Sequence, residues 1–350
     1  MNLVKESLRD FKGYIPKQAP CEIKLDANEG KNILLEEVFK EGIILNKDFA
    51  LNFYPDSNST ELREEISKYV NVKPSNIVVG NGSNESIELI IKTFVDKGEI
   101  VLSFVPTFHM YAVFSQIYSA KFIGVESNED FSFDIKKLIN KAKEVNPKVI
   151  FLSNPNNPTG YLTERKDLIE LLENTNSIVV IDEAYFEFCS VTLVEEINRY
   201  DNLIILRTLS KAFGLAGIRL GYIVANEKLS DILNGVRSPY NINYLTQYIG
   251  IQALKNKDKL LAYAELVQQE RDGLEQKLID FGLTTYKSHG NFLFAKSDIK
   301  NLGDKIADKG IQIRGYAGNL DGFYRITIGN QQENEIFIKI LGEIVENEKS

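Results

Sequence analysis

The sequence predicts an α/β protein: a mainly parallel central sheet with helices on both faces, joined to a smaller α+β domain. Between about residues 60 and 235, apolar runs of strand length alternate with segments of helical spacing. This alternation indicates a parallel sheet, because each parallel strand needs a crossover, usually a helix, to reach the next one. From about residue 241 the pattern changes to a long helical stretch followed by short strands. We therefore expect a large domain over residues 30–240 and a small domain made of residues 1–29 and 241–350.

The expected strands of the large domain are mostly near-continuous apolar runs, which is typical of strands covered on both faces. In chain order they lie at residues 77–79, 100–103, 121–125, 149–152, 178–181, 203–206 and 221–224. The small domain is expected to hold strands at residues 290–295, 311–314 and 323–328. The N-terminal segment is expected to pack with that domain.

A glycine-rich turn follows the first of these strands. It leads into a segment with helical spacing at Ile87, Ile90 and Ile91. The backbone N–H groups at the start of such a helix face outward and attract anions, so a phosphate could bind at Gly82, Ser83 and Asn84. A lone glycine-rich turn is weak support, because plain connections and dinucleotide sites contain it as often.

A lysine follows the apolar run 203–206 in a setting that suits covalent chemistry. Lys211 lies among the hydroxyl residues Thr208 and Ser210, and Arg219 comes eight positions later. A lysine beside a buried strand end can lose its proton and form a Schiff base with an aldehyde cofactor. The two hydroxyl groups and the guanidinium would then complete a phosphate pocket.

Polar residues also follow two neighbouring strands. Asp182 ends the apolar run 178–181, where it could keep the nitrogen of a heterocyclic cofactor protonated or merely cap the next helix. Asn157 lies in the rigid turn 154–160, which holds two prolines and a glycine. Asn157 and Tyr185 could both contact the phenolic oxygen of such a ring.

These residues together carry a resemblance to a known family. In order and approximate spacing, Asn157, Asp182, Tyr185, Lys211 and Arg219 resemble the fold-type I pyridoxal-phosphate aminotransferases. Within that group the chain looks most like the histidinol-phosphate aminotransferases. The supporting stretches are residues 24–29, 54–56, 80–83, 106–111, 154–160, 182–185, 210–219, 237–241 and 324–329.

The resemblance implies roles for the cofactor-site residues. Lys211 would hold pyridoxal 5'-phosphate as a Schiff base and move the proton between the substrate Cα and the cofactor, and Asp182 would hold the pyridinium. Phe108 stands where the family stacks an aromatic ring, usually tyrosine, on the pyridine face. Tyr54 would reach the phosphate of the neighbouring subunit's cofactor, which implies a homodimer.

The resemblance also implies a substrate site. Arg325 would bind the carboxylate of the amino donor, and Tyr14, Arg314 and Arg325 would bind a substrate phosphate, with Asn291 nearby. The expected reaction converts L-histidinol phosphate and 2-oxoglutarate to imidazole acetol phosphate and L-glutamate, a step of histidine biosynthesis. Two stretches depart from the family pattern: Asn28-Glu-Gly-Lys31 replaces Asn-Glu-Asn-Pro, and Phe108-His-Met-Tyr111 replaces Tyr-x-Met-Tyr. We expect the substrate-side wall to differ accordingly.

Composition narrows the class of protein. A net charge of −8 argues against a nucleic-acid or anionic-membrane surface, since either needs a clustered basic face. The two cysteines, Cys21 and Cys189, lie far apart without metal-type spacing, so neither a metal site nor a disulfide framework is expected. The N-terminus is too charged for a secretory signal, and no apolar stretch approaches the ~20 residues that cross a bilayer. We therefore expect a cytoplasmic protein that acts on small molecules.

The sequence leaves two kinds of alternative open. An aromatic amino acid aminotransferase or a threonine-phosphate decarboxylase of the same fold would share most of the motifs. A nucleotide-binding or regulatory protein without catalysis would explain the glycine-rich turn at residues 80–83, but it gives no reason for Lys211, Asp182, Asn157 and Arg219 to occur together.

Overall fold

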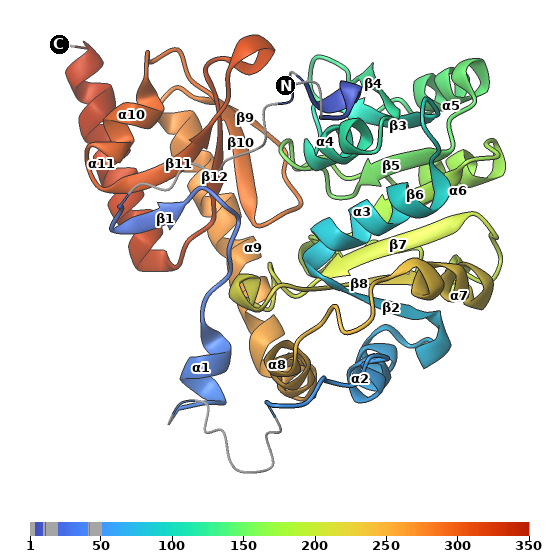
Figure 1. The fold of residues 1–350 in the computed structure, drawn as a ribbon. Coiled ribbons are helices and arrows are strands. Elements are labelled where there is room, and N and C mark those ends of the chain that lie inside the picture. The colour runs from blue at the N-terminus through green and yellow to red at the C-terminus, as the bar shows by residue number, and fades with distance from the viewer. Residues whose placement is uncertain (1–3, 10, 12–19, 41, 43–50, 350) are drawn as a thin grey trace.

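The computed structural model describes residues 4–9, 11, 20–40, 42 and 51–349. Its larger sheet is seven-stranded, with the strand order β2-β8-β7-β6-β5-β3-β4 (Figure 1). The strands are β2 (Ile77–Asn81), β3 (Ile100–Val105), β4 (Lys121–Glu126), β5 (Val149–Ser153), β6 (Ile178–Asp182), β7 (Leu203–Thr208) and β8 (Leu220–Ala225). β8 runs antiparallel to its neighbours β2 and β7, and the pairs on the β7-to-β4 side of the sheet are parallel. The predicted mainly parallel α/β sheet is thus confirmed.

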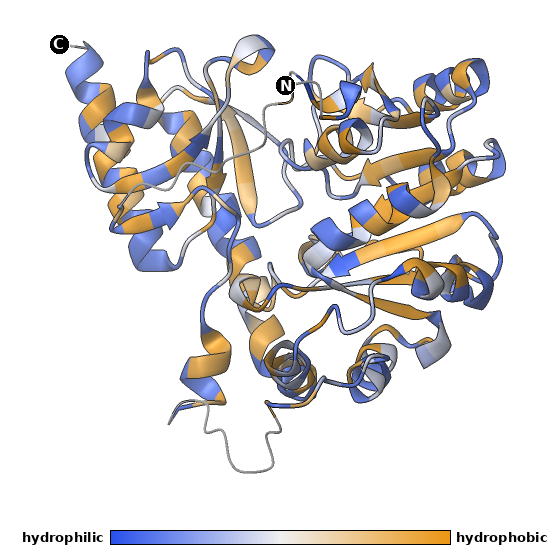
Figure 2. Ribbon diagram, viewed as in Figure 1, coloured by the Kyte–Doolittle hydropathy of each residue, from blue (hydrophilic) through white to orange (hydrophobic). Residues whose placement is uncertain are grey.

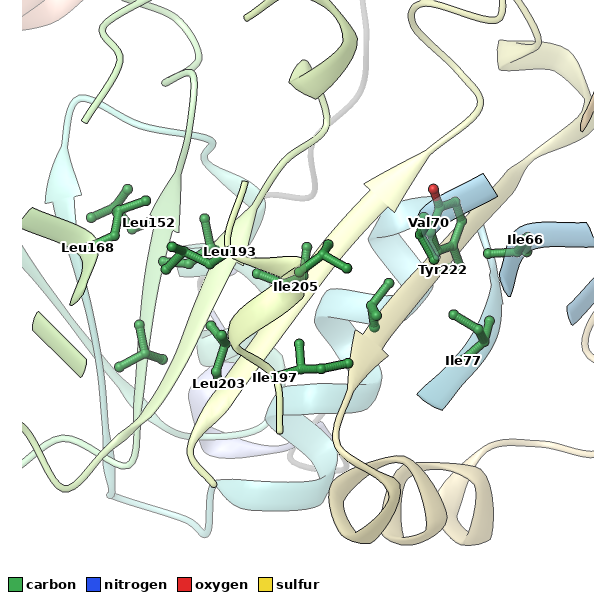
Figure 3. Close-up of a cluster of buried hydrophobic side chains, with 14 of the residues drawn as sticks. Ile66, Val70, Ile77, Leu152, Leu168, Leu193, Ile197, Leu203, Ile205 and Tyr222 are labelled. Carbon is green, nitrogen blue, oxygen red and sulfur yellow. The ribbon is translucent and has the colours of Figure 1, made fainter. Parts of the chain in front are cut away.

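The helices around this sheet bury their apolar sides against it. They are α2 (Thr60–Val70), α3 (Gly82–Phe94), α4 (Met110–Ile117), α5 (Ile135–Val145), α6 (Arg165–Glu173), α7 (Glu227–Val236) and α8 (Tyr244–Lys255). Successive strand residues point to opposite faces, so Ile205 joins one buried cluster while Ile204 and Leu206 join the other. Figure 2 shows the strands of this sheet as hydrophobic, and Figure 3 shows Ile205 and Leu203 in the cluster that also holds Ile66 of α2 and Leu168 of α6.

Side-chain caps fix where several of these helices begin. The carboxylate of Asp134 accepts a hydrogen bond from the backbone N–H of Lys136 at the start of α5. Asn226 and Asn243 accept equivalent bonds at the starts of α7 and α8. Such caps satisfy N–H groups that the helix itself leaves without a partner.

The smaller sheet has the order β1-β11-β12-β10-β9. Its strands are β1 (Ile23–Leu25), β9 (Thr284–Tyr286), β10 (Phe292–Lys296), β11 (Ile311–Gly315) and β12 (Phe323–Thr327), and its helices are α9 (Lys257–Asp280), α10 (Leu302–Ala307) and α11 (Gln331–Lys349). The short helix α1 (Ile33–Glu37) follows β1, and 3₁₀ turns lie at Glu6–Leu8, Pro74–Asn76, Phe186–Phe188, Val194–Glu196, Ala216–Ile218 and Gly318–Leu320. β1 pairs in parallel with β11, so this part of the N-terminal segment packs with the small sheet, as expected. β1 and β9 themselves were not predicted, because three residues are too few to show a period.

The long helix α9 leads from one sheet to the other (Figure 1). Leu260, near its start, belongs to the core of the large sheet, whereas Val267 and Leu274 belong to the core of the small one. The expected division, with residues 30–240 in a large domain and residues 1–29 and 241–350 in a small one, remains a proposal. Because α8 packs in the core of the large sheet, its packing favours a domain boundary inside α9 instead of one at residue 240.

An aromatic contact joins the two sheets directly. Phe131 lies in the loop between β4 and α5, and its ring packs edge-on against Tyr286, Phe294 and Phe323 of the small sheet at centroid distances of 4.7, 5.2 and 5.5 Å. Edge-to-face pairs of this kind contribute beyond the area they bury. Phe131 therefore helps to fix the small sheet against the large one.

None of the helices in the described ranges combines the length and apolarity needed to cross a membrane.

Candidate active site

The candidate site lies where the parallel strands β5, β6 and β7 end. Carboxyl ends of parallel strands meet at one edge of a sheet and commonly bind ligands there. A buried ion pair ties two of these ends together: Nε and Nη2 of Arg207 donate to Oε2 of Glu183 at 3.0 and 2.9 Å. The adjacent residues, Asp182 and Thr208, are thereby held in fixed positions at the strand ends.

Asp182 is a buried carboxylate, with only 3% of the residue exposed. Its Oδ2 accepts a hydrogen bond from the hydroxyl of Tyr111 at 2.7 Å, and its Oδ1 accepts one from the backbone N–H of Ala184 at 3.2 Å. Burial raises the pKa of Asp182 to about 6, although both hydrogen bonds act in the opposite direction. Such a carboxylate suits a protonated ring nitrogen, because a positive partner would favour its charged form.

No local sequence pattern gives Tyr111 a role. Its side chain is fully buried and stacks on Phe151, with ring centroids 4.5 Å apart. The one signal for it was its place in the stretch 106–111 that resembles the family. Nothing in that stretch reveals that the hydroxyl reaches a strand end 71 positions away.

The amine of Lys211 lies close enough for its charge to lower the pKa of Asp182, and we refer to the groups around these two side chains as the pocket. Its Nζ donates to the backbone carbonyl of Ala27 at 2.8 Å and lies 6.0 Å from the centre of the Tyr185 ring. Burial, followed by the positive charge of Arg325, lowers the pKa of Lys211 to about 7. A substantial fraction of this lysine is therefore neutral near pH 7 and can act as a nucleophile.

The glycine-rich turn and Arg219 form a close-fitting cradle. Gly82 begins α3 with a φ of +76°, and a Cβ there would lie 2.5 Å from Nη2 of Arg219. A Cβ on Gly221 would lie 2.5 Å from the backbone nitrogen of Ser83, so β8 also approaches the turn closely. Ser83 and Asn84 occupy the first turn of α3, whose N–H groups attract anions.

Two hydroxyl groups extend this cradle at the end of β7. The Oγ1 of Thr208 lies 2.9 Å from the Oγ of Ser210, and it accepts a hydrogen bond from the backbone N–H of Ser210 at 3.1 Å. Together with the guanidinium of Arg219 they supply the donors that a phosphate group needs. The residues predicted to bind phosphate are thus brought together in space.

Asn157 and Tyr185 lie on the side of the pocket that faces the small sheet. The Oδ1 of Asn157 accepts a hydrogen bond from Nη1 of Arg325 at 2.5 Å. The hydroxyl oxygen of the buried Tyr185 accepts one from Nδ2 of Asn28 at 3.0 Å. Asn28 had no predicted role, because its contacts depend on strands nearly 300 positions away in the chain.

Arg325 and Asn291 carry polar atoms that lack hydrogen-bond partners. Nη2 of Arg325 donates to the carbonyl of Asp26 at 2.6 Å, but its buried Nε has no partner among the described residues. The buried Oδ1 of Asn291 is also unpartnered within the described part of the chain, while its Nδ2 donates to the carbonyl of Asn28 at 3.1 Å. Such atoms are rare in folded proteins and commonly mark a ligand site.

Arg314 lies directly across from Arg325 in the antiparallel pair of β11 and β12. Residues opposite each other in such a pair point to the same face of the sheet. Partial burial and then the charges of Arg314 and Arg325 lower the pKa of His109, which places the imidazole within the field of both arginines. Phe108, beside it, packs edge-on against Tyr111 at 5.7 Å.

The departure at residues 30–31 has a structural explanation. A Cβ on Gly30 would lie 2.4 Å from the backbone oxygen of Lys211, and a Cβ on Gly214 would lie 2.0 Å from the backbone oxygen of Lys31. The N-terminal segment therefore packs backbone to backbone against the loop that carries Lys211. The side chain of Lys31 forms an ion pair with Glu333 of α11.

Two predicted residues lie outside this pocket or cannot be placed. Tyr54 is 80% exposed and stacks on Tyr240 with ring centroids 4.6 Å apart, so it does not reach the pocket of its own chain. Tyr14 falls outside the described residues.

The donor set fits pyridoxal phosphate. The pocket combines an amine with a lowered pKa, a buried carboxylate, a glycine cradle closed by Arg219, and unpartnered polar atoms on the wall toward the small sheet. An aldehyde, a ring nitrogen, a phosphate and a substrate anion would each meet a suitable group.

Comparison with known proteins gives the same family. The family model for aminotransferase class I and II matches residues 21–341. The histidinol-phosphate aminotransferase of Caldanaerobacter subterraneus subsp. tengcongensis is 41% identical over 348 residues, which cover 98% of this chain and 99% of that relative.

Two solved structures share the fold. The histidinol-phosphate aminotransferase from Clostridium acetobutylicum has a TM-score of 0.83 at 27% identity, covering 93% of this chain and 99% of its own. The one from Sinorhizobium meliloti, solved in complex with pyridoxal-5'-phosphate, has a TM-score of 0.89 at 20% identity, covering 99% and 98%. The chain belongs to the class I and II aminotransferases, and within them to the histidinol-phosphate aminotransferase family.

Proposed function

We propose that this protein is a pyridoxal-phosphate-dependent aminotransferase that transfers the amino group of L-histidinol phosphate to 2-oxoglutarate in histidine biosynthesis. The observation that carries the proposal is the amine of Lys211 at the strand ends. Its pKa is lowered to about 7, and the amine lies close enough to the buried carboxylate of Asp182 to lower the pKa of that carboxyl. The family membership supports the reaction type. It disfavours a nucleotide-binding protein without catalysis, since that alternative gives no role to Lys211.

The side chains of the pocket divide the chemistry among them. Bound pyridoxal phosphate would supply an aldehyde and an electron-accepting ring. Asp182 would keep the ring nitrogen protonated, and Asn157 and Tyr185 would donate to the ring's phenolic oxygen. Lys211 would attack the aldehyde as a neutral amine and later move the proton between the substrate Cα and the cofactor. The cradle of Gly82, Ser83, Asn84, Thr208, Ser210 and Arg219 would hold the phosphate.

The wall toward the small sheet would bind both substrates in turn. Arg325 can hold a carboxylate of glutamate or 2-oxoglutarate through two parallel hydrogen bonds, and the same guanidinium can hold the phosphate of histidinol phosphate. Arg314 lies beside it, and its charge favours a doubly charged phosphate over a neutral ring. Phe108 would stack on the cofactor ring, and Asn291 and Tyr14 would complete the substrate site.

A donor screen tests this proposal. Purified protein with bound cofactor is assayed with 2-oxoglutarate and, in turn, L-histidinol phosphate, aromatic amino acids and threonine phosphate. We expect L-histidinol phosphate to have the highest kcat/KM. Better turnover of aromatic amino acids would identify an aromatic aminotransferase, and release of carbon dioxide from threonine phosphate would identify a decarboxylase.

We also propose that the protein is a homodimer. Tyr54 and Tyr240 stack on each other with 80% and 44% of their surfaces exposed, and the neighbouring Leu51 and Phe53 are exposed as well. A second copy could cover these rings and receive the Tyr54 hydroxyl at its cofactor phosphate. Light scattering should give twice the chain mass of 39.7 kDa. A monomeric mass at assay concentration would contradict the shared site.

The cytoplasm is the compartment that we propose for the protein. Both cysteines, Cys21 and Cys189, are free thiols. Thiols stay reduced in that compartment. Fractionation of cells that express the protein from its own gene would test the location.

A further inference from the structure

Asn28 is a fully buried residue at the junction of the two sheets. It follows β1, has 0% of its surface exposed, and adopts a φ of +53°. Asparagine tolerates this left-handed conformation better than most residues, but the conformation still costs energy. The hydrogen bonds of its side chain offer a reason for keeping it there.

The direction of each hydrogen bond around Asn28 follows from the groups involved. The backbone N–H of Asn28 donates to Oγ1 of Thr327 at 3.0 Å, so this hydroxyl has its own proton left to donate. That proton goes to Oδ1 of Asn28, which lies 3.1 Å away. The Nδ2 of the same amide therefore points the other way, toward the hydroxyl of Tyr185 at 3.0 Å.

The consequence concerns the proton of Tyr185. An amide NH₂ group can only donate, so the Tyr185 oxygen must act as the acceptor in this bond. The proton of the Tyr185 hydroxyl is then free to be donated elsewhere, and Nζ of Lys211 lies 6.0 Å from the centre of the same ring. A ligand oxygen near Lys211 would receive it.

We propose that Asn28 is a positioning residue that turns the Tyr185 hydroxyl into a dedicated donor toward the cofactor, with Thr327 fixing the orientation of the Asn28 amide. This inference rests on the proposed cofactor. A hydrogen bond donated to the phenolic oxygen stabilises its negative charge and so weakens its hold on the proton of the Lys211 nitrogen. Asn28 thereby helps to keep that nitrogen's pKa low.

The test is a pH titration of the visible absorption of the bound cofactor, in the absence of substrate. In Asn28→Asp the new carboxylate accepts a hydrogen bond from the Tyr185 hydroxyl, whereas the Asn28 amide donates one to the hydroxyl oxygen. We therefore expect the spectral transition to move up by about one pH unit. Aspartate also tolerates the left-handed conformation, so the backbone is kept. Thr327→Val, which removes the hydroxyl that orients the amide, should move the transition in the same direction by less.

Three controls separate positioning from other effects. Thr327→Ser keeps the hydroxyl and should titrate as the wild type does. Asn76→Ala removes a buried asparagine that donates to the carbonyl of Ala225, far from the pocket, and should lower Tm without moving the transition. In a Tyr185→Phe background, Asn28→Asp should retain only the effect of its charge, so its shift should be clearly smaller.

Specific outcomes would overturn the inference. Asn28 does not act through that hydroxyl if both Asn28→Asp and Thr327→Val titrate as the wild type does. The same conclusion follows if Asn28→Asp shifts the transition equally in the presence and in the absence of the Tyr185 hydroxyl. Absence of any cofactor band in the wild-type protein would instead overturn the cofactor assignment itself.

Discussion

Two parts of the pocket contrast in how the chain builds them. The floor consists of Gly82, Asp182, Thr208, Lys211 and Arg219. The first four lie at or shortly after the end of a strand of the large sheet, and Arg219 lies just before β8. The wall consists of Asn28, Asn291, Arg314 and Arg325, which come from the N-terminal segment and the small sheet. The Asn28 and Thr327 contact that anchors the wall spans 299 positions, whereas each floor residue is placed by its own strand.

This difference separates two tasks. The floor residues are those proposed to bind and activate the cofactor, a task common to every substrate. The wall residues other than Asn28 are those proposed to bind the substrate. One departure from the family pattern, at residues 30–31, lies in the N-terminal segment that forms part of this wall. The other is Phe108, whose neighbour His109 lies within the field of Arg314 and Arg325. Floor substitutions should therefore affect all amino donors alike, and wall substitutions should distinguish among them.

The largest expected effect is on the floor. Lys211→Ala removes both the nucleophile and the proton carrier, and we expect kcat to fall by roughly 10⁴-fold or more with every donor. Borohydride reduction followed by peptide mapping should label Lys211 in the wild type and nothing in the variant. Residual turnover within tenfold of wild type for even one donor would mean that the floor does not serve all substrates.

A wall substitution should be weaker and selective. Arg325→Gln keeps a planar polar group but loses the charge, and KM for glutamate and for histidinol phosphate should rise by about 10- to 100-fold, the usual loss for a hydrogen bond to a charged group. Steady-state kinetics with a neutral, unphosphorylated amine as the matched donor should show a much smaller change. Equal losses for charged and neutral donors would break the division between floor and wall.

The pH dependence of cofactor attachment joins the two parts. The pKa of Lys211 is lowered to about 7, so its neutral fraction falls as pH drops below that value. Attachment of pyridoxal phosphate to cofactor-free protein should slow about tenfold per pH unit below 7 and level off above it. Because Arg325 also lowers this pKa, the midpoint should move upward in Arg325→Gln. Stopped-flow absorbance would measure both profiles, and an unchanged midpoint in the variant would show that the two parts are independent.

The smallest effect concerns the support of the floor. Tyr111→Phe removes the hydrogen bond to Oδ2 of Asp182, which holds the pKa of that carboxyl down against burial. The pKa of Asp182 should then rise above about 6, so that less of it is ionised at pH 6 to 7. We expect cofactor affinity, measured by fluorescence titration, to fall by about three- to tenfold at pH 6 and by less at pH 8. A loss that does not depend on pH would point to packing alone.

Sequence patterns predicted the floor better than the wall for a physical reason. Asp182 and Lys211 each follow an apolar run that identifies its own strand, so local sequence places them at one edge of the sheet. Residues 23–25 and 284–286 are too short to show a period, and they became strands only through pairing with β11 and β10. The roles of Tyr111 and Asn28 depend on such long-range pairing, and no local pattern encodes it. The individual roles of the site residues, including Tyr54 and Tyr14, stay predictions.

The parallel pairing of β1 with β11 also bears on synthesis. Ile23 emerges from the ribosome nearly 290 residues before its partner Ile311, a delay of roughly 15 to 60 seconds at ordinary translation speeds. During that interval the large sheet can already form, while the first strand has no neighbour for its backbone groups. A nascent chain could therefore acquire the cradle for the vitamin-derived group well before it can discriminate between amines.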